Sequence, residues 1–91
     1  MAVYMVSYDL NSPGQKYQNL YDALESYSSY WHCLDSTWLI KTDDRPTQIL
    51  DHLASALDKN DTLLVAKVSA PAAAEGLSKD CSDWLENHLG G

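Results

Sequence analysis

Asp9 is the residue whose type and position point most directly to chemistry. It lies at the end of a predicted strand, residues 2–10, that is rich in β-branched and aromatic side chains. If alternate residues from Val3 to Asp9 form a face that meets a second copy of the chain, the two Asp9 carboxylates approach each other. Paired carboxylates share a proton or hold a hard cation such as Mg²⁺, and that ion activates water against a phosphodiester. The simpler interpretation, which the residues alone favour, is that Asp9 and Asn11 form the side-chain turns that begin the loop.

The stretch 30–38 is the most unusual in composition, with two tryptophans around a polar centre. It contains the three residue types of a hydrolytic site: His32, Asp35 and Ser36. His32 and Ser36 would approach each other only if the strand bends, and no nucleophile-elbow sequence is present. We therefore interpret Trp31 and Trp38 as anchors of the core or of a dimer. His32 is interpreted as a hydrogen-bonded strand residue that retains a role as proton donor near a phosphate.

Cys33 and Cys81 are too few for a disulfide framework, and neither has the spacing of a metal ligand. We interpret both as small buried residues with reduced thiols. No basic region followed by an apolar stretch indicates a signal peptide, and no apolar run reaches membrane-spanning length. We therefore expect a cytoplasmic protein without membrane contact. His52 and His88 have no partner at a suitable spacing and receive no role.

The hydrophobic periodicity predicts seven elements along the chain. Strands are expected at residues 2–10, 30–34, 37–42 and 62–68. A first helix is expected to begin at Ser12 as N-cap, with Pro13 and Gln15 completing the motif. A second helix opens at residues 43–46, and a last amphipathic helix is capped by Ser78.

The order β-α-β-β-α-β plus a C-terminal helix is that of an α+β, ferredoxin-like fold, with an antiparallel sheet and both main helices on one face. We expect a single domain over residues 1–91, with a core at 2–68 and a C-terminal helical extension at 69–91. The first and last strands along the chain carry apolar side chains on both faces, whereas a sheet with one solvated face should alternate apolar and polar residues. One short helix cannot cover the second face of four strands. We therefore expect a homodimer through the sheet faces.

Charge and length narrow the functional classes. The chain has 91 residues and a net charge of −7, with six basic residues against thirteen acidic ones. Four of the bases and nine of the acids lie in residues 43–91, which gives that half a net charge of −5. The size excludes an enzyme that buries a large cofactor within one chain. The charge argues against broad binding to a phosphate backbone and fits a basic protein partner.

Three segments resemble a known family. They are Val6-Ser7-Tyr8-Asp9-Leu10-Asn11 with Pro13-Gly14, Trp31-His32 with Leu34-Asp35-Ser36-Thr37-Trp38, and Asn60-Asp61-Thr62-Leu63-Leu64-Val65. Together they resemble the small SinR-type proteins, relatives of the CRISPR-associated protein two family and of the virulence-associated protein D toxins. The resemblance covers most of residues 3–68 and reaches into the helix at 77–85.

The resemblance implies a ferredoxin-like fold and a homodimer across the sheet faces. It also implies an acid at the end of the first strand that binds a metal between the subunits in the nuclease members. Asp9 matches that acid, and Ser36 is similar to the serine that opens the third strand in the CRISPR-associated family. The chain lacks the arginine-rich segments of that family, which argues against the DNA bridging of integration complexes.

Two functions follow from the sequence. The first is a metal-dependent endonuclease of toxin or defence type, acting on RNA or DNA, in which Asp9 from each subunit holds Mg²⁺ and Ser36 and His32 are further candidates for the catalytic site. The second is a non-catalytic interaction module whose acidic half binds a basic protein partner.

Overall fold

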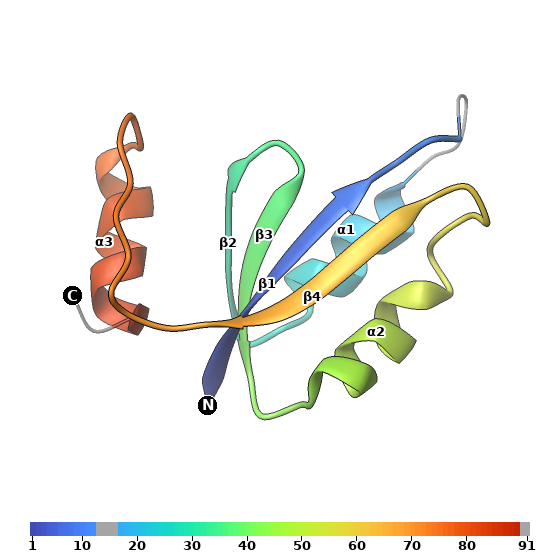
Figure 1. Ribbon diagram of the computed structural model, residues 1–91, viewed down its shortest axis with the longest axis horizontal. Helices are drawn as coiled ribbons and strands as arrows, with labels where there is room; N and C mark the ends of the chain where they lie inside the picture. The colour runs from blue at the N-terminus through green and yellow to red at the C-terminus, as the bar shows by residue number, and fades with distance from the viewer. Residues whose placement is uncertain (13–16, 90–91) are drawn as a thin grey trace.

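The computed structural model describes residues 1–12 and 17–89 of the chain. The elements follow each other as β1 (Ala2–Asp9), α1 (Gln18–Glu25), β2 (Ser29–Leu34), β3 (Thr37–Thr42), α2 (Pro46–Ala54), β4 (Thr62–Val68) and α3 (Lys79–Leu89). The four strands form one antiparallel sheet in the order β2-β3-β1-β4 (Figure 1). The predicted small α+β fold, with an antiparallel sheet and a C-terminal helix, is confirmed.

β1 and β3 occupy the centre of the sheet, and β2 and β4 form its edges. Because β1 pairs antiparallel with β3 and β4, and β3 pairs antiparallel with β2, β1 runs parallel to β2 and β3 runs parallel to β4. Each of the helices α1 and α2 therefore connects two parallel strands that have one further strand between them.

The start of the first helix differs from the prediction. α1 begins at Gln18 and the residue before it is Tyr17, so Ser12 is not its N-cap, and Pro13 and Gln15 lie outside the described residues. The start of α2 is as the sequence indicates, with Pro46 in the first turn, where its missing N–H would have no helical partner in any case.

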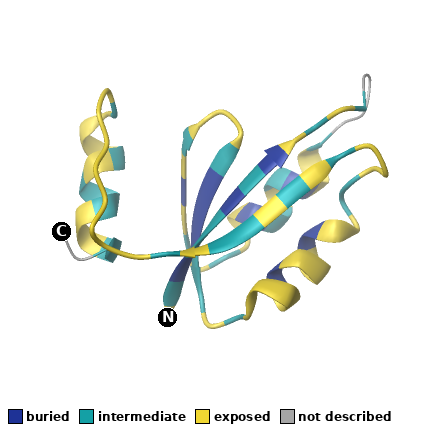
Figure 2. Cartoon of the chain, in the orientation of Figure 1, coloured by how far each residue is buried: buried dark blue, intermediate teal, exposed yellow. Residues whose placement is uncertain are grey.

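The first face of the sheet carries the main core, and α1 and α2 pack against it (Figure 2). Its buried side chains are Val6, Tyr8, Leu20, Leu24, Trp38, Ile40, Ile49 and Leu53. Full burial of one side chain of this size contributes roughly 1.5–3 kcal/mol, so this face is the main source of stability. The interpretation of Trp38 as a core anchor is confirmed.

The second face of the sheet has its own smaller core under α3. Val3, Trp31 and Leu39 are buried there, and apolar side chains of α3 pack on them. The interpretation of Trp31 as a core anchor is therefore confirmed as well. The indole of Trp31 also donates a hydrogen bond of 3.0 Å to the carbonyl oxygen of Cys81, which fixes the first turn of α3 over β2.

A disulfide joins Cys33 of β2 to Cys81 of α3, so the expectation of two reduced thiols is wrong. The two Cα atoms are 6.3 Å apart, within the range that a disulfide spans. The physical reason is packing: Cys33 follows Trp31 on the face that α3 covers, and Cys81 lies on the apolar side of α3. Closing a loop of this length stabilises a fold by roughly 4 kcal/mol through the entropy of the unfolded chain. The cytoplasmic location, which rested partly on reduced thiols, stays a prediction.

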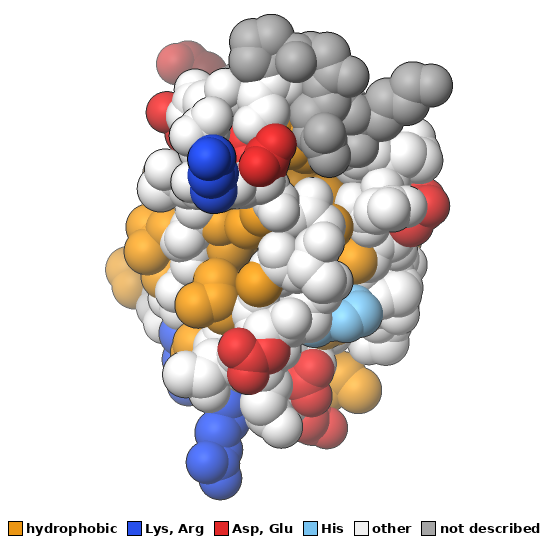
Figure 3. Space-filling view, turned by 90° about the vertical axis from the view of Figure 1, so that its right-hand side faces the viewer, with side chains coloured by type: hydrophobic (Ala, Val, Ile, Leu, Met, Phe, Trp, Pro, Cys, Tyr) orange, Lys and Arg blue, Asp and Glu red, His pale blue; other side chains and the backbone are white. Residues whose placement is uncertain are grey.

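Half of the second face remains open. α3 lies over β2 and the ends of the neighbouring strands, and beyond it Leu64 of β4 is 57% exposed while Met5 and Ala66 are half-buried. Seen from the right-hand side of Figure 1, hydrophobic side chains remain at the surface (Figure 3). We call Met5, Leu64 and Ala66 the open patch. Within the described residues, no helix is long and apolar enough to span a membrane.

Candidate functional site

Asp9 lies at the rim of the open patch. It is the last residue of β1, opposite Thr62 of β4, and Ser7 two residues earlier lies opposite Leu64. Since alternate residues of a strand point to the same face, Asp9 and Ser7 share the second face with Met5. Ser7, Asp9, Thr62 and Leu64 line a small, shallow hollow there. The Asp9 side chain is exposed in it.

The loop after β1 is built without the Asp9 carboxylate. Asn11 donates from Nδ2 to the carbonyl oxygens of Asp9 at 3.4 Å and of Asn60 at 3.2 Å, so Asn11 performs the turn role that the sequence suggests. Asp9 contributes only its backbone oxygen to this turn. Within residues 1–12 and 17–89, no hydrogen bond or ion pair reaches its carboxylate. The simpler interpretation therefore accounts for Asn11 and leaves the Asp9 side chain without a structural task in the described residues.

Asp61 is the carboxylate that holds this end of the molecule together. Its Oδ1 accepts hydrogen bonds of 2.8 Å from the Asn11 backbone N–H and from the Tyr17 hydroxyl, and its Oδ2 accepts one of 2.8 Å from the Asp58 N–H. Partial desolvation acts to raise the pKa of Asp61, but these hydrogen bonds to the charged form outweigh it and hold the pKa below the usual value. No pattern in the sequence marks Asp61 as the carboxylate with this role.

Ser36 lies at the same end of the sheet as Asp9. Its carbonyl oxygen accepts a hydrogen bond of 3.0 Å from the Tyr8 N–H and one of 3.4 Å from the Ser7 hydroxyl. The hydroxyls of Ser7 and Thr37 are 3.2 Å apart and bonded to each other. A group of hydroxyls and one carboxylate therefore gathers where β1, the β2–β3 turn and β4 meet.

His32 lies on the other face. Its ring stacks on Trp38 of the main core, with the ring centroids 4.0 Å apart and the planes inclined by 10°. Its Nε2–H donates to the backbone oxygen of Asp35 at 3.3 Å, and the Asp35 carboxylate is not involved. This confirms His32 as a hydrogen-bonded strand residue. The structure does not assemble His32, Asp35 and Ser36 into a hydrolytic arrangement, and it separates His32 from Asp9 by the thickness of the sheet.

A divalent cation would require more ligands than one chain supplies at this end. Across residues 1–12 and 17–89, no group of three or more His, Cys, Asp or Glu side chains is close enough to hold a metal ion. Asp9 offers one carboxylate with hydroxyls beside it, and Mg²⁺ typically takes one or two carboxylates and completes its octahedron with water and substrate phosphate. The residues fit Mg²⁺ only if a second carboxylate approaches from another chain.

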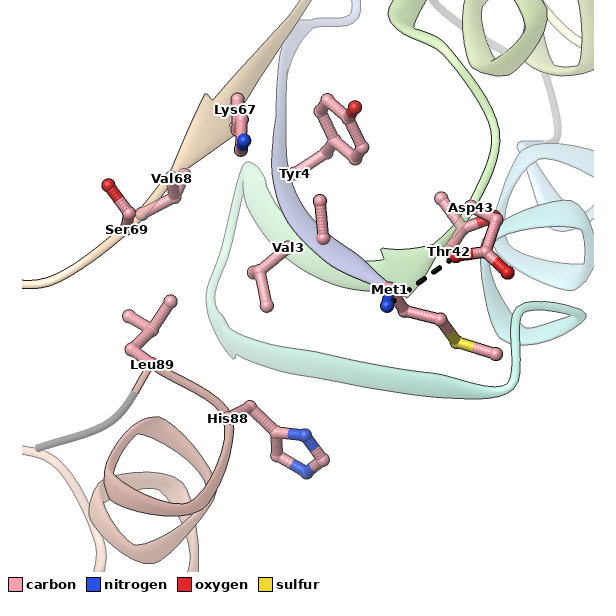
Figure 4. A pocket seen from close by; sticks show the side chains of 11 residues that line it. Met1, Val3, Tyr4, Thr42, Asp43, Lys67, Val68, Ser69, His88 and Leu89 are labelled. Carbon is pink, nitrogen blue, oxygen red and sulfur yellow. Dashed lines mark ion pairs between the residues drawn. The ribbon is translucent and has the colours of Figure 1, made fainter.

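The far end of the sheet holds a hollow of about 390 Å³, between the strand ends and the last turn of α3 (Figure 4). His88 lines it, and its Nδ1 is 3.1 Å from the Lys41 Nζ. Burial, and then the positive charge of Lys41, lower the pKa of His88 below the ordinary value of 6.5. Lys67, the terminal amine of Met1 and Asp43 also line this hollow, and the last two form an ion pair of 3.5 Å. Sequence reasoning gave His88 no role because its partner lies 47 residues away.

Comparison of the chain with models of protein families, with curated proteins and with solved structures found no match.

The depressed pKa of His88 predicts that α3 holds less firmly in acid. A detached α3 binds a proton on His88 near pH 6.5, whereas the docked helix resists it, so the contribution to docking is present above that pH and is lost as the pH falls through the lower pKa of the folded state. NMR titration of the His88 ring should give a pKa below 6.5, and Lys41→Gln should move it upward. His52→Gln is the matched control and should leave the titration unchanged. A His88 pKa at or above 6.5 would contradict the prediction.

Proposed function

We propose that the protein acts as a homodimer joined through the open patch, in which the two Asp9 carboxylates meet at the seam, hold Mg²⁺ and promote cleavage of a phosphodiester in RNA or DNA. One observation carries the proposal. The Asp9 carboxylate is exposed at the rim of an apolar surface and makes no hydrogen bond or ion pair within the described residues.

The open patch supports a second copy as the occupant. Met5 and Ala66 lie directly opposite each other on β1 and β4, and Leu64 is the next residue of β4 on the same face. Apolar groups on a sheet face are normally covered, and no helix among the described residues covers the open patch, so a second copy of the chain is the cover that we propose. In a two-fold dimer only residues close to the axis meet their own counterparts, so the proposal places the axis over the end of β1 and β4 where Asp9 lies.

The chemistry proposed for the seam, the dimer interface where the two Asp9 residues meet, follows from the two Asp9 carboxylates and the hydroxyls beside them. When bound there, Mg²⁺ would supply a Lewis acid for a phosphoryl oxygen and lower the pKa of water for attack on phosphorus. The Asp9 pair would hold the ion, and the hydroxyls of Ser7 and Thr62 would orient water and phosphate oxygens around it. Ser36, whose backbone lies at the same end, would contact the substrate backbone in this proposal. His32 has no part in this proposal because it lies on the other face.

We also propose that the fold is the ferredoxin-like plan. The support is the arrangement of two β-α-β units, each with its parallel strands separated by a strand of the other unit, and with α1 and α2 on one face. In this plan the two β-α-β units place both of their helices on one face of the sheet. The other face is the one that α3 covers in part and that the proposed partner would also cover.

A charge placed in the open patch should disrupt the dimer. Leu64→Asp would bury a carboxylate against apolar side chains of the partner, so the variant should sediment at the 10.1 kDa of one chain while the wild type sediments at twice that mass. Leu64 is 57% exposed within one chain, so the monomer should keep its fold by circular dichroism. Asn19→Asp adds the same charge on the exposed side of α1 and should leave the dimer intact. A wild type that is monomeric at all concentrations tested would overturn the dimer.

Removal of the Asp9 charge should abolish metal-dependent cleavage. Asp9→Asn keeps the size of the side chain but loses the anionic ligand, so cleavage of labelled RNA or DNA with Mg²⁺ or Mn²⁺ should fall by at least about a hundredfold. Calorimetry should show loss of Mn²⁺ binding in the same variant. Asp51→Asn, on the exposed side of α2, is the matched control and should retain both properties. The nuclease proposal fails if the wild type leaves both nucleic acids intact across the pH range, or if Asp9→Asn remains active.

The charge of the chain favours a second candidate, a non-catalytic module that binds a basic protein. Its net charge of −7 would attract a basic surface and repel a nucleic-acid backbone. Binding to a purified basic partner should then weaken steeply as salt screens the interaction, and Asp9→Ala should leave it unchanged. Binding that is insensitive to salt would exclude this function. Binding that is lost in Asp9→Ala would show that the basic protein contacts the surface around Asp9.

A further inference from the structure

We propose that the Cys33–Cys81 disulfide is a redox-controlled latch, and that a dithiol reductant which opens it releases α3 and enlarges the apolar surface available to a second copy of the chain. The release of α3 is independent of the function proposed above, whereas its effect on assembly rests on the proposed homodimer.

α3 is attached more weakly than the other helices. None of its eleven side chains, all of them among the described residues, is fully buried, whereas α1 and α2 each place two in the main core. The segment that leads to it, residues 69–76, is exposed throughout and forms neither helix nor strand. Figure 1 shows α3 set to one side of the sheet at the end of this long connection.

Few bonds besides the disulfide hold α3 in place. The indoles of Trp31 and Trp84 make one hydrogen bond each across the contact, both of 3.0 Å, and Lys41 meets His88 at the last turn. The end of α3 forms one wall of the hollow in Figure 4, with Leu89 across from the strand residues Val3 and Val68. Partly buried side chains and, among the described residues, three polar contacts are features of a locally weak element, so the covalent link adds to the attachment of α3.

The surface under α3 continues directly into the open patch. One row of paired residues crosses the whole sheet, and its members are Trp31, Leu39, Met5 and Ala66. α3 covers the first two, which are 6% and 7% exposed, and the last two lie in the open patch. The position of α3 therefore sets how much of a single apolar row is exposed.

The disulfide is placed where a reductant can reach it. Cys33 lies on β2, an edge strand, Cys81 lies in the first turn of α3, and both are only half-buried. A thiolate of the dithiol attacks one sulfur, and the other leaves as a thiolate and takes a proton. The second thiol of the reductant then closes its own disulfide and releases the remaining cysteine as a thiol. Two electrons and two protons pass from the dithiol to the cysteine pair.

The expected increase in the open population of α3 after reduction follows from the entropy of loop closure. With β4 folded, α3 stays tethered by residues 69–78, so the disulfide closes only a short loop. A disulfide that closes a loop of roughly 15 residues favours the closed state by about a hundredfold. Reduction should therefore raise the open population of α3 by about that factor, and a second copy can then compete for the row that α3 covered.

Hydrogen exchange of the wild-type protein, with and without dithiothreitol, tests the release. Amides of α3 should exchange about a hundredfold faster after reduction, while those of the central strands β1 and β3 keep their protection and serve as the internal control. A protein with Cys33→Ser and Cys81→Ser should behave as the reduced form and should not respond to dithiothreitol. Unchanged exchange in α3 after full reduction, verified by thiol counting, would overturn the latch.

Sedimentation of the same samples tests the assembly. Reduction should tighten the homodimer by at least about tenfold, because the shared surface then includes Trp31 and Leu39. If α3 is released but the protein stays monomeric in both states, the latch holds and the proposed homodimer fails. If the dimer forms equally in both states and α3 keeps its protection, the dimer holds and the latch fails. A dimer that weakens on reduction would show that α3 itself forms the interface and would overturn the proposed effect on assembly.

Discussion

A four-stranded sheet with apolar side chains on both faces must bury both faces against other elements. In the described residues, helices cover the first face fully and the second face only in part. α1 and α2 complete the first face, where eight side chains form the main core. The second face receives one short helix at one side only, with Val3, Trp31 and Leu39 beneath it. The disulfide, the open patch and the proposed seam are all consequences of that shortage, since each lies on the incompletely covered face.

The elements and their order were predictable because strand alternation and helical periodicity are local properties of the sequence. The double-sided apolar pattern of β1 and β4 also correctly indicated two packed faces. The pairing of Cys33 with Cys81 was not predictable in this way. The two residues are 48 positions apart, and their approach depends on which part of the second face the last helix covers, which is decided by side-chain packing across the whole sheet.

The candidate site shows the same division between local and distant information. Asp9 and Asp61 lie at one end of the sheet, and the sequence identified only the first as chemically interesting. Hydrogen bonds from Asn11 and Tyr17, 50 and 44 positions away, add to a local one from Asp58 and give Asp61 its structural role, whereas the Asp9 side chain is exposed. No local pattern distinguishes a carboxylate that organises a loop from one that faces solvent, because the donors come from elsewhere in the chain.

The central position of β1 has a consequence for the ends of the chain. Within residues 1–12 and 17–89, β4 pairs with no strand other than β1, so every ladder hydrogen bond between β4 and the sheet depends on the eight residues Ala2–Asp9. β1 is therefore the only link within the sheet between β4 and β3 among the described residues. Loss of residues 2–9 would detach β4 from the sheet, and the connection to α3 with it.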